Sequence, residues 1–564
     1  MYFQKHPTRT GLVFFVILFG LSISIIKLSM IQIFHSSFLT DKADKQHNHV
    51  VELEPRRGTI YDRNMHALAL NVLMYSMYAN PMIMSDEEKS STVTQISQVI
   101  GMSAQAIAQK LEKSKHFAWI ARKIPQEAYE KLKGMKLHGI GFVKESKRFY
   151  PNGALAAHVV GFANIDNVGL QGVEYEYDKY LHGTRGMAEF LRDARQRDLL
   201  LEKDFIEPKD GEDVVLTLDE TIQFIAENAL DKAFKKYNAK AGTIIVMDPK
   251  TGEVLAFANR PTFRPDAPDA SSVESRTNRA VAFVYEPGSV FKIVTASGAL
   301  EEGAFKEEDD IFCENGHYLV GNHILKDAHP KGHLTFQEVV EESSNIGVTK
   351  IAQKIGANKV YEYARRYRFG MKTNIGMMGE VNGLLKHPST WSKTSIGAVP
   401  IGQEVTVTSV QLLGMIASVA NDGVYMKPYY VKYIKDNNGA VTQVGHPEVV
   451  SRVLRKDIAL RMKNILKGVV DRGTAQLAKM KDITAAGKTG TAQKVVNGTY
   501  SHSQFVASFI GFAPVEDPKL AIVVTIDEPH PAYYGGVVSG PVFKEGVEDS
   551  LKYLATKKEA RDAP

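Results

Sequence analysis

Three short segments of the chain contain residue types that together can transfer an acyl group through a serine nucleophile. The first holds Ser289 and, three residues later, Lys292; the second holds Ser343 and Asn345; the third is the run at residues 488–491. A serine hydroxyl is a poor nucleophile at neutral pH, so it needs an adjacent base that takes its proton during attack. Because the first two residues are three apart, we expect them to share a helix face, with the amine within reach of the hydroxyl. The spacing therefore predicts a nucleophile and its base.

The lysine can act as a base only if its pKa falls well below the ordinary value. Burial of Lys292 and a second cation nearby both favour the neutral amine, and Lys488 is the candidate for that cation. Ser343 can relay a proton between the lysine and the leaving group, and the Asn345 amide can hold Lys292 and the substrate's peptide backbone. Each of these polar side chains thus has a chemical role.

The third segment is predicted to lie on a strand edge beside Ser289 and to bind the substrate's carboxylate. Lys488 and the hydroxyls of Thr489 and Thr491 are the candidate ligands of that carboxylate, and Gly490 would let the substrate backbone approach closely. The backbone N–H groups of Ser289 and Thr491 are the expected oxyanion hole, in which one donor typically contributes about 3–4 kcal/mol of transition-state stabilisation.

The residues around the serine predict a helix start. Pro287 and Gly288 interrupt the preceding segment, and residues 290–300 are mostly apolar or small, which places Ser289 at or near the N-terminus of a helix. Backbone donors and the positive end of the helix dipole would then lie beside the nucleophile.

Each segment alone is a weak signal. Ser24 and Lys27 have the same spacing inside an apolar stretch where this chemistry makes no sense, and residues 487–489 resemble the end of a phosphate-binding loop. The phosphate-loop interpretation fails because Asp482 stands where that loop needs a glycine. In this order, the three segments form the S-x-x-K, S-x-N and K-T-G signature of penicillin-binding proteins and class A β-lactamases.

Composition limits the other possibilities. The 564 residues are 44% hydrophobic and 24% charged, which is ordinary for globular domains. The net charge of +5 is small, with no basic stripe interleaved with aromatic residues, so nucleic acid is not an expected partner. One cysteine, Cys313, excludes intrachain disulfides and thiolate zinc clusters, and we expect it to be a small buried residue. The 17 histidines show no ligand-like clustering, so no metal site is predicted.

Residues 11–34 predict a membrane anchor. Residues 11–26 carry no charge, and with residues 28–34 they form an apolar stretch of about 24 residues, enough to cross a bilayer core of roughly 30 Å. Lys27 interrupts the stretch but can snorkel or face a partner helix. The alternative, a cleaved signal peptide, is less favoured because the stretch is long and no A-x-A-like cleavage site follows. Residues 1–10 would then be a cytoplasmic tail, and the rest of the chain would lie outside the cytoplasm.

Beyond the anchor, the pattern predicts a non-catalytic pedestal over residues 35–212, a catalytic domain over 213–556 and a loose tail over 557–564. In the pedestal, residues 103–133 are expected to be helical, with Trp119 among the core positions. In the catalytic domain we expect an α/β (α+β) fold, in which helices flank an antiparallel sheet. Its predicted elements are strands at 214–218, 243–247, 253–257, 490–494, 505–512 and 520–526 and helices at 220–236 and 541–554.

The chain resembles the class B high-molecular-weight penicillin-binding proteins, which are membrane-anchored peptidoglycan transpeptidases. Besides the three segments above, the resemblance rests on R-G-x-I-x-D-R-N at residues 57–64, R-x-Y-P at 148–151 and G-x-x-G-x-E at 169–174, so it covers nearly the whole chain. Val290 stands where the family commonly has threonine, but that side chain is not a catalytic one. The resemblance implies a penicillin-recognising domain on an elongated pedestal used for dimerisation or interaction.

The resemblance also implies a reaction. The substrate would be a peptidoglycan stem peptide ending in D-Ala-D-Ala, from which Ser289 expels the terminal D-alanine and forms an acyl-enzyme; an amine of a neighbouring stem peptide would then form the crosslink. β-Lactams would mimic the donor, and no cofactor is implied. The pattern from Glu286 through the SSN segment is most similar to the septal, cell-division subgroup. An elongation-specific or sporulation-specific enzyme would share the same motifs.

Other functions remain as alternatives. A D,D-carboxypeptidase or a β-lactamase would pass the acyl group to water, but such enzymes do not usually carry this pedestal. A β-lactam sensor would need further membrane spans or a cytoplasmic domain, and a purely structural scaffold would leave the three intact segments unexplained. The anchor and residues 57–64 resemble the surfaces by which class B enzymes engage a SEDS-type polytopic glycan polymerase. That polymerase and other divisome membrane proteins are therefore the predicted partners.

Overall fold

The structure, a computed structural model, describes residues 7–34, 48–113, 117–192, 198–200 and 206–562 and contains two compact units. The first unit comprises Met1–Arg56 and Gly183–Asp210. Its stretch Gly11–Ile33, with a mean hydropathy of 2.4, is the one helical stretch in the described ranges that is long and apolar enough to cross a membrane. The elements of this unit are α1 (Pro7–Ser29), the π-helical turn η1 (Met30–Phe34) and an antiparallel sheet of β1 (Asn48–Leu53), β8 (Gly186–Arg192) and β9 (Asp198–Leu200).

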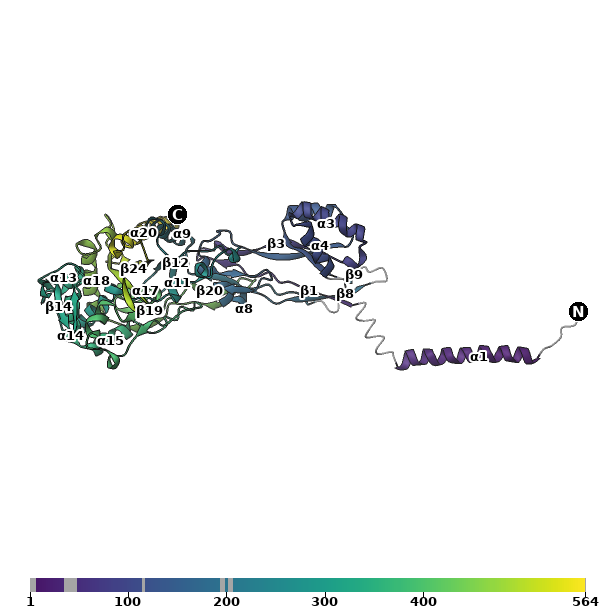
Figure 1. Ribbon diagram of the computed structural model, residues 1–564, viewed down its shortest axis with the longest axis horizontal. Coiled ribbons are helices and arrows are strands. Elements are labelled where there is room, and N and C mark those ends of the chain that lie inside the picture. Colours follow the sequence, from purple (N-terminus) through teal and green to yellow (C-terminus); the bar gives the residue numbers. More distant parts are fainter. Residues whose placement is uncertain (1–6, 35–47, 114–116, 193–197, 201–205, 563–564) are drawn as a thin grey trace. The chain divides into compact units, whose positions relative to one another are not determined.

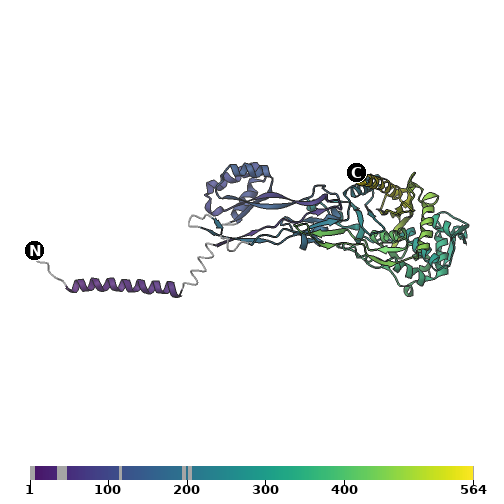
Figure 2. The ribbon, with the colours of Figure 1, turned by 180° about the vertical axis from the view of Figure 1, so that it is seen from behind.

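The second unit comprises Arg57–His182 and Gly211–Pro564, and its amino-terminal part is built on one long strand, β3 (Ala67–Ala79) (Figure 1). This strand pairs antiparallel with β4 (Ala118–Ile124) and with β5 (Ile140–Phe149). In both ribbon views, α3 (Asp86–Ile100) and α4 (Ala104–Lys113) lie at the end of β3 that is farther from the C-terminal sheet (Figures 1 and 2). The other elements of this part are η2 (Pro81–Ile83), α5 (Gln126–Gly134), α6 (Ala157–Val160), β6 (Phe162–Ala163), β7 (Gly169–Gln171), α7 (Gly172–Glu176) and α8 (Asp178–Leu181).

The prediction of one helix over residues 103–133 is wrong for the middle of this segment. The segment divides into α4, the strand β4 and α5. At the start of β4, Ala118 and Ile120 are buried while Trp119 between them is exposed, so burial alternates with the period of two that is typical of a strand. Trp119 is therefore not a core residue.

A buried ion-pair network joins the three motifs of the pedestal. Glu174 has no exposed side-chain surface, and its two carboxylate oxygens lie 2.7 Å from Arg57 Nε and 2.5 Å from Arg148 Nε. Breaking a buried pair of this kind by removing one partner is strongly destabilising, because it leaves an uncompensated buried charge. The three motifs are far apart in the sequence, but each contributes one residue to the same buried ion-pair network.

The pedestal continues directly into the catalytic domain. The short strand β2 (Ile60–Tyr61) pairs with β3 and runs parallel to β10 (Asp213–Leu216), which in turn pairs with β20 (Val431–Lys435). Together with β21 (Val441–Val444), these strands form one sheet in the order β21-β20-β10-β2-β3-β4. Strands from the pedestal and from the following domain therefore share one hydrogen-bonded sheet.

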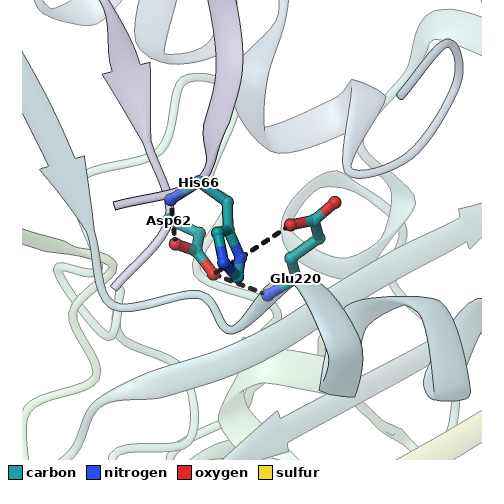
Figure 3. Close-up of side chains that lie close together, drawn as sticks. All are labelled: Asp62, His66 and Glu220. Atoms are coloured by element: carbon teal, nitrogen blue, oxygen red, sulfur yellow. Dashed lines mark hydrogen bonds and ion pairs between the residues drawn. The ribbon is translucent and has the colours of Figure 1, made fainter. Parts of the chain in front are cut away.

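A polar cluster of Asp62, His66 and Glu220 lies where the β2–β3 turn meets the first helix of the catalytic domain, α9 (Glu220–Lys236) (Figure 3). The buried Asp62 carboxylate accepts hydrogen bonds from the backbone N–H groups of Asn64 (2.7 Å), His66 (2.8 Å) and Glu220 (3.1 Å). His66 Nδ1 lies 2.8 Å from Glu220 Oε2. The cluster therefore attaches the pedestal motif to the N-terminus of α9.

The catalytic domain is organised around a five-stranded antiparallel sheet in the order β12-β11-β25-β24-β23 (Figure 1). Alternate residues of β25 face opposite sides: Ile522 faces the C-terminal helix α20, whereas the Thr525 hydroxyl lies 3.2 Å from that of Ser409 at the start of α17. Helices therefore cover both faces, which confirms the predicted fold class. The bounds are β11 (Ala241–Met247), β12 (Val254–Arg260), β23 (Ala486–Val496), β24 (Thr499–Ala513), β25 (Leu520–Asp527), α17 (Ser409–Ala420) and α20 (Gly540–Asp562).

The C-terminal helix is longer than the sequence predicts. Residues 557–562, expected to be a loose tail, continue α20, because Lys557 Nζ contacts Asn64 Oδ1 at 2.5 Å and Asp219 Oδ2 at 3.2 Å. Residues 563–564 of the predicted tail lie outside the described residues.

A second group of elements, mostly helical, completes the catalytic domain and contains the serine and SSN segments. These elements are η4 (Pro268–Ala270), α10 (Val273–Arg276), α11 (Arg279–Ala282), η5 (Gly288–Phe291), α12 (Lys292–Glu301), β13 (Asp310–Phe312), η6 (Glu314–Gly316), β14 (His317–Val320), β15 (His323–Lys326), β16 (His333–Thr335), α13 (Phe336–Glu341), α14 (Asn345–Ile355), α15 (Ala357–Arg366), β17 (Leu384–Leu385), η7 (Pro388–Thr390), α16 (Ser395–Ala398), η8 (Val399–Ile401), β18 (Val405–Thr406), β19 (Val424–Met426), β22 (Val449–Arg452), α18 (Lys456–Asp471), η9 (Gln476–Ala478) and α19 (Gly535–Val538).

Candidate active site

Ser289 lies in a 3-10 turn, η5, that leads directly into α12. The sequence predicts a helix from residue 290, whereas the α-helix begins at Lys292. Gly288 adopts a left-handed conformation with φ of +56°, and 3-10 turns are frequent at helix N-termini. Ser289 is only half-buried, whereas the other three residues of this turn are buried.

The structure brings four of the five predicted catalytic side chains into direct contact. Lys292 Nζ donates hydrogen bonds to Ser343 O (2.5 Å), Ser343 Oγ (3.1 Å) and Asn345 Oδ1 (2.8 Å). Lys488 Nζ lies 2.9 Å from the same Ser343 Oγ. Within the described part of the chain, the hydroxyl of the fifth residue, Ser289, makes no side-chain hydrogen bond. Catalytic hydrogen bonds are often long in ligand-free enzymes and tighten when substrate binds.

Both lysines of the site are completely buried, and their pKa values reflect this. Burial lowers the pKa of Lys292 to about 7, and the negative charge of Asp327 acts in the opposite direction. Burial also lowers the pKa of Lys488 well below its ordinary value, and the positive charge of Lys292 lowers it further. The sequence predicts that both burial and the second cation favour the neutral amine; in the structure, burial is the cause that lowers the pKa of Lys292.

The K-T-G segment lies on β23, the edge strand of the five-stranded sheet. A Cβ atom placed on Gly288 would lie 3.1 Å from Thr491 O, so this carbonyl faces the serine turn. The N–H and C=O of one residue in an antiparallel strand point to the same side. The Thr491 N–H group therefore also faces the turn of Ser289, as the predicted oxyanion hole requires.

Gly490 has a packing role that the sequence analysis did not predict. A Cβ atom at this position would lie 2.3 Å from Ser508 Oγ, 2.7 Å from Val290 Cγ2 and 2.9 Å from Pro287 O. The missing side chain therefore makes room for the serine turn to pack against β23. In the structure this glycine therefore allows close approach of the protein's own backbone.

The two threonines of the K-T-G segment are held by neighbours that the sequence analysis did not single out. Thr489 Oγ1 lies 3.0 Å from Thr474 Oγ1, which belongs to the loop after α18. Thr491 Oγ1 accepts a hydrogen bond of 3.0 Å from the backbone N–H of Gly535. No sequence motif marks Thr474, because its proximity to β23 depends on the path of a loop.

A third residue missed by the sequence analysis is Asp327, in the loop after β15. It accepts hydrogen bonds from Ser344 Oγ (2.7 Å) and from the backbone N–H of Asn345 (2.5 Å). Cys313 lies on the other side of the same serine, with its Sγ 3.4 Å from Ser344 Oγ. The cysteine is fully buried, as predicted, and burial raises the pKa of its thiol.

Comparisons with known proteins show the family to which the chain belongs. The profile of the "Penicillin binding protein transpeptidase domain" family matches residues 242–548, and that of the "Penicillin-binding Protein dimerisation domain" matches residues 52–216. The chain belongs to the penicillin-binding protein family, as the resemblance of its sequence motifs implies.

Individual relatives resemble the chain over most of its length. "Probable peptidoglycan D,D-transpeptidase PenA" of Neisseria meningitidis is 34% identical over 92% of this chain and 88% of its own length. "Stage V sporulation protein D" of Bacillus subtilis is also 34% identical, over 96% of this chain and 86% of its own length. Among solved structures, penicillin-binding protein 3 of Mycobacterium tuberculosis in complex with aztreonam is similar with a TM-score of 0.69 and 27% identity, covering 90% of this chain and 97% of that one.

Proposed function

We propose that the chain is a peptidoglycan D,D-transpeptidase that joins stem peptides through an acyl ester on Ser289. The observation that carries this function is the arrangement around one hydroxyl, Ser343 Oγ, which contacts both Lys292 and Lys488 beside the serine turn. The family and the names of its relatives support the same reaction.

In the acylation step, the donor peptide lies along the open edge of β23 with its terminal carboxylate on the hydroxyls of Thr489 and Thr491. The carbonyl oxygen of the penultimate D-alanine accepts from the N–H groups of Ser289 and Thr491, where negative charge develops. Neutral Lys292 takes the proton of Ser289 as the new C–O bond forms. The C–N bond then breaks, and a proton passes through Ser343 to the departing amine, so that free D-alanine leaves.

In the second step, the side-chain amine of a neighbouring stem peptide attacks the ester carbonyl in the same oxyanion hole. A new amide bond forms, the ester C–O bond breaks, and the proton lost by the amine returns to Ser289 Oγ through Lys292. The enzyme is regenerated and the two peptides are crosslinked. In a β-lactam the departing nitrogen stays tethered to the acyl group, so it cannot leave and the adduct persists.

The location of this reaction follows from the anchor. We place residues 1–10 in the cytoplasm, the anchor at 11–34, the pedestal at 35–212 and the transpeptidase domain at 213–556 outside the cytoplasm. The apolar helix near the N-terminus supports a membrane-anchored protein. For partners, we propose a SEDS-type glycan polymerase and other divisome membrane proteins; failure to co-purify with the polymerase in mild detergent would count against this pairing.

We assign the enzyme to septal wall synthesis during division. The pattern from Glu286 through the SSN segment supports this subgroup. A sporulation role is the second candidate, because a sporulation protein is as similar to the chain as the PenA relative. A fluorescent fusion in the source organism separates the two: septal bands in growing cells support division, whereas a signal confined to sporulating cells supports the alternative.

A crosslinking assay tests the reaction itself. Purified full-length protein in detergent is given a donor peptide ending in D-Ala-D-Ala and an acceptor peptide with a free side-chain amine, and products are followed by mass spectrometry. We expect one D-alanine released for each crosslink formed. Release of D-alanine with only the hydrolysed donor would indicate a carboxypeptidase, and steady turnover of a β-lactam would indicate a β-lactamase.

A further inference from the structure

The carboxylate of Asp327 holds the first turn of α14, the helix that begins within the SSN segment. Its Oδ1 accepts from the backbone N–H of Asn345 (2.5 Å) and of Ile346 (3.1 Å), and its Oδ2 accepts from Ser344 Oγ (2.7 Å). The N–H groups of a first helical turn lack partners within the helix, and negative charge is stabilising there. Three donors from consecutive residues thus fix the position of this turn.

The same loop also orients the amide of Asn345. Its Nδ2 donates to Lys326 O at 2.9 Å, which turns Oδ1 toward Lys292 Nζ at 2.8 Å. Exchanging the two amide atoms would place two donors against each other at Lys292 and two acceptors against each other at Lys326. The carbonyl of Lys326, the residue before Asp327, therefore determines which atom of the amide meets the Lys292 amine.

The turn held by Asp327 is strained. Ser343 has φ of +60°, in the left-handed region that a residue with a side chain rarely adopts. In this conformation both its carbonyl oxygen and its hydroxyl contact Lys292 Nζ. Strained residues of this kind persist only where the surrounding structure holds them. The hydrogen bonds of Asp327 to the next two residues supply such a hold.

The carboxylate of Asp327 contacts the first turn of α14, and its charge acts on Lys292. Across the described residues it makes no ion pair with a lysine, arginine or histidine, so its contacts are the three hydrogen bonds to the α14 turn. The charged group that acts on the pKa of the Lys292 amine is Asp327, from the loop after β15. The charge of Lys292 in turn lowers the pKa of Lys488, from β23. The carboxylate raises the pKa of Lys292 against the larger opposing effect of burial.

We propose that Asp327 is a positioning residue for acylation, which holds Ser343 and Asn345 against the Lys292 amine and balances the charge there. It does not touch the reacting atoms. This inference rests on the proposed function, because it assumes that Lys292 is the base for Ser289. It adds a residue from outside the three motif segments to the machinery of the reaction.

Three variants separate the charge of Asp327 from its geometry. Asp327→Asn keeps the size and an acceptor for the helix N–H groups, and its amide can donate to Ser344 Oγ, so it removes mainly the charge. Ser344→Ala leaves the charge and removes one of the three hydrogen bonds, together with the helix cap in which Ser344 Oγ accepts from the backbone N–H of Gly347 at 2.9 Å. Asp310→Asn is the matched control, because Asp310 pairs with His333 on the same part of the domain and makes no contact with the SSN segment.

The measurement is the second-order rate of acylation by a fluorescent penicillin across pH, with the melting temperature of each variant. For Asp327→Asn we expect the plateau acylation rate to fall about 10-fold. We also expect the acid-side decline of the pH–rate profile to move to lower pH, because loss of a nearby negative charge lowers the pKa of the Lys292 amine. For Ser344→Ala we expect the rate to fall by up to about 10²-fold because Ser343 and Asn345 are misplaced. The acid-side decline of the pH–rate profile should stay at the wild-type pH. Asp310→Asn should behave as wild type.

The inference would be overturned if Asp327→Asn had the wild-type plateau rate and the wild-type acid-side decline of the pH–rate profile. It would also be overturned if the rate fell only in proportion to a loss of folded protein while the acid-side decline stayed at the wild-type pH. The Ser289→Ala variant separates this failure from a failure of the proposed function. If wild type forms no adduct at Ser289, the proposed function itself is wrong and this inference falls with it. If wild type is acylated and Asp327→Asn is unaffected, only the role of Asp327 is wrong.

Discussion

The side-chain amines of Lys292 and Lys488 contact the same hydroxyl, with Ser343 Oγ 3.1 Å from the first and 2.9 Å from the second. Both side chains are completely buried. Two like charges so close together in a poorly solvated site disfavour each other, so protonation of one lysine opposes protonation of the other. Ser343 is therefore placed to pass a proton between two amines that compete for it.

The acylation rate should depend on pH through Lys292. Burial lowers the pKa of this amine to about 7, and a base must be unprotonated to accept the proton of Ser289. The rate is therefore expected to be maximal above this pKa and to fall as pH decreases through about 7. Stopped-flow measurement of β-lactam acylation gives the profile. The Lys292→Arg variant should show almost no acylation at any pH, because a guanidinium stays charged; a flat wild-type profile from pH 5 to about 9 would contradict the assignment of the base.

Loss of the bridging hydroxyl should slow acylation without unfolding the protein. We expect Ser343→Ala to lower the acylation rate by about 10²-fold, the lower range for a positioned proton-transfer group. Its melting temperature should stay close to that of wild type. The matched control is Ser389→Ala, which removes a hydroxyl from an exposed turn. Equal rates for Ser343→Ala and wild type would show that the hydroxyl is not on the proton path.

An alanine at Gly490 should damage both stability and activity. Its Cβ atom would lie 2.3 Å from Ser508 Oγ and 2.9 Å from Pro287 O, so β23 and the serine turn must separate. Overpacking of this kind typically costs about 1–3 kcal/mol, and a displaced nucleophile lowers the rate further. Thermal unfolding and acylation rate report the two effects. Gly134→Ala is the control, since a Cβ atom there meets nothing within 4 Å; if both variants melt and react alike, the packing role of Gly490 is wrong.

Removal of the C-terminal contact should lower stability. Burial acts to raise the pKa of Asp219, but hydrogen bonds from Asn64 and the charge of Lys557 outweigh it and lower that pKa. We therefore expect Lys557→Ala to cost about 1 kcal/mol and to lower the melting temperature by about 2 °C. The control Lys558→Ala changes an exposed neighbour and should leave it unaltered. Identical melting curves for both variants would support the loose tail that the sequence predicts.

The grouping of these side chains could be predicted from the sequence because the segments that carry them are short and follow one another in a known order. A three-residue spacing brought Lys292 next to the serine turn, and the two further segments supplied Ser343 and Lys488. The helix predicted over residues 220–236 coincides with α9, because its apolar positions follow the helical period and Asp219 caps its N-terminus. These predictions depended on local patterns alone.

The remaining features depend on contacts between distant segments. Asp327 and Thr474 lie in loops without a motif, and only the folded chain brings them to Ser344 and Thr489. The sequence analysis missed the strand β4 because its short alternation of buried and exposed residues lies between the helices α4 and α5. This segment is a strand because it pairs with β3, and the sequence of residues 103–133 alone contains no information about that pairing.

The central claim is that Ser289 is the acylated nucleophile, and intact-mass analysis tests it most directly. Purified wild type and the Ser289→Ala variant are each incubated with a β-lactam, and the mass is followed over time, with peptide mapping of any adduct. The account predicts a stable adduct of one equivalent on wild type, located on the peptide that contains Ser289, and none on the variant. An adduct on the variant, or rapid loss of the wild-type adduct with drug turnover, would contradict it.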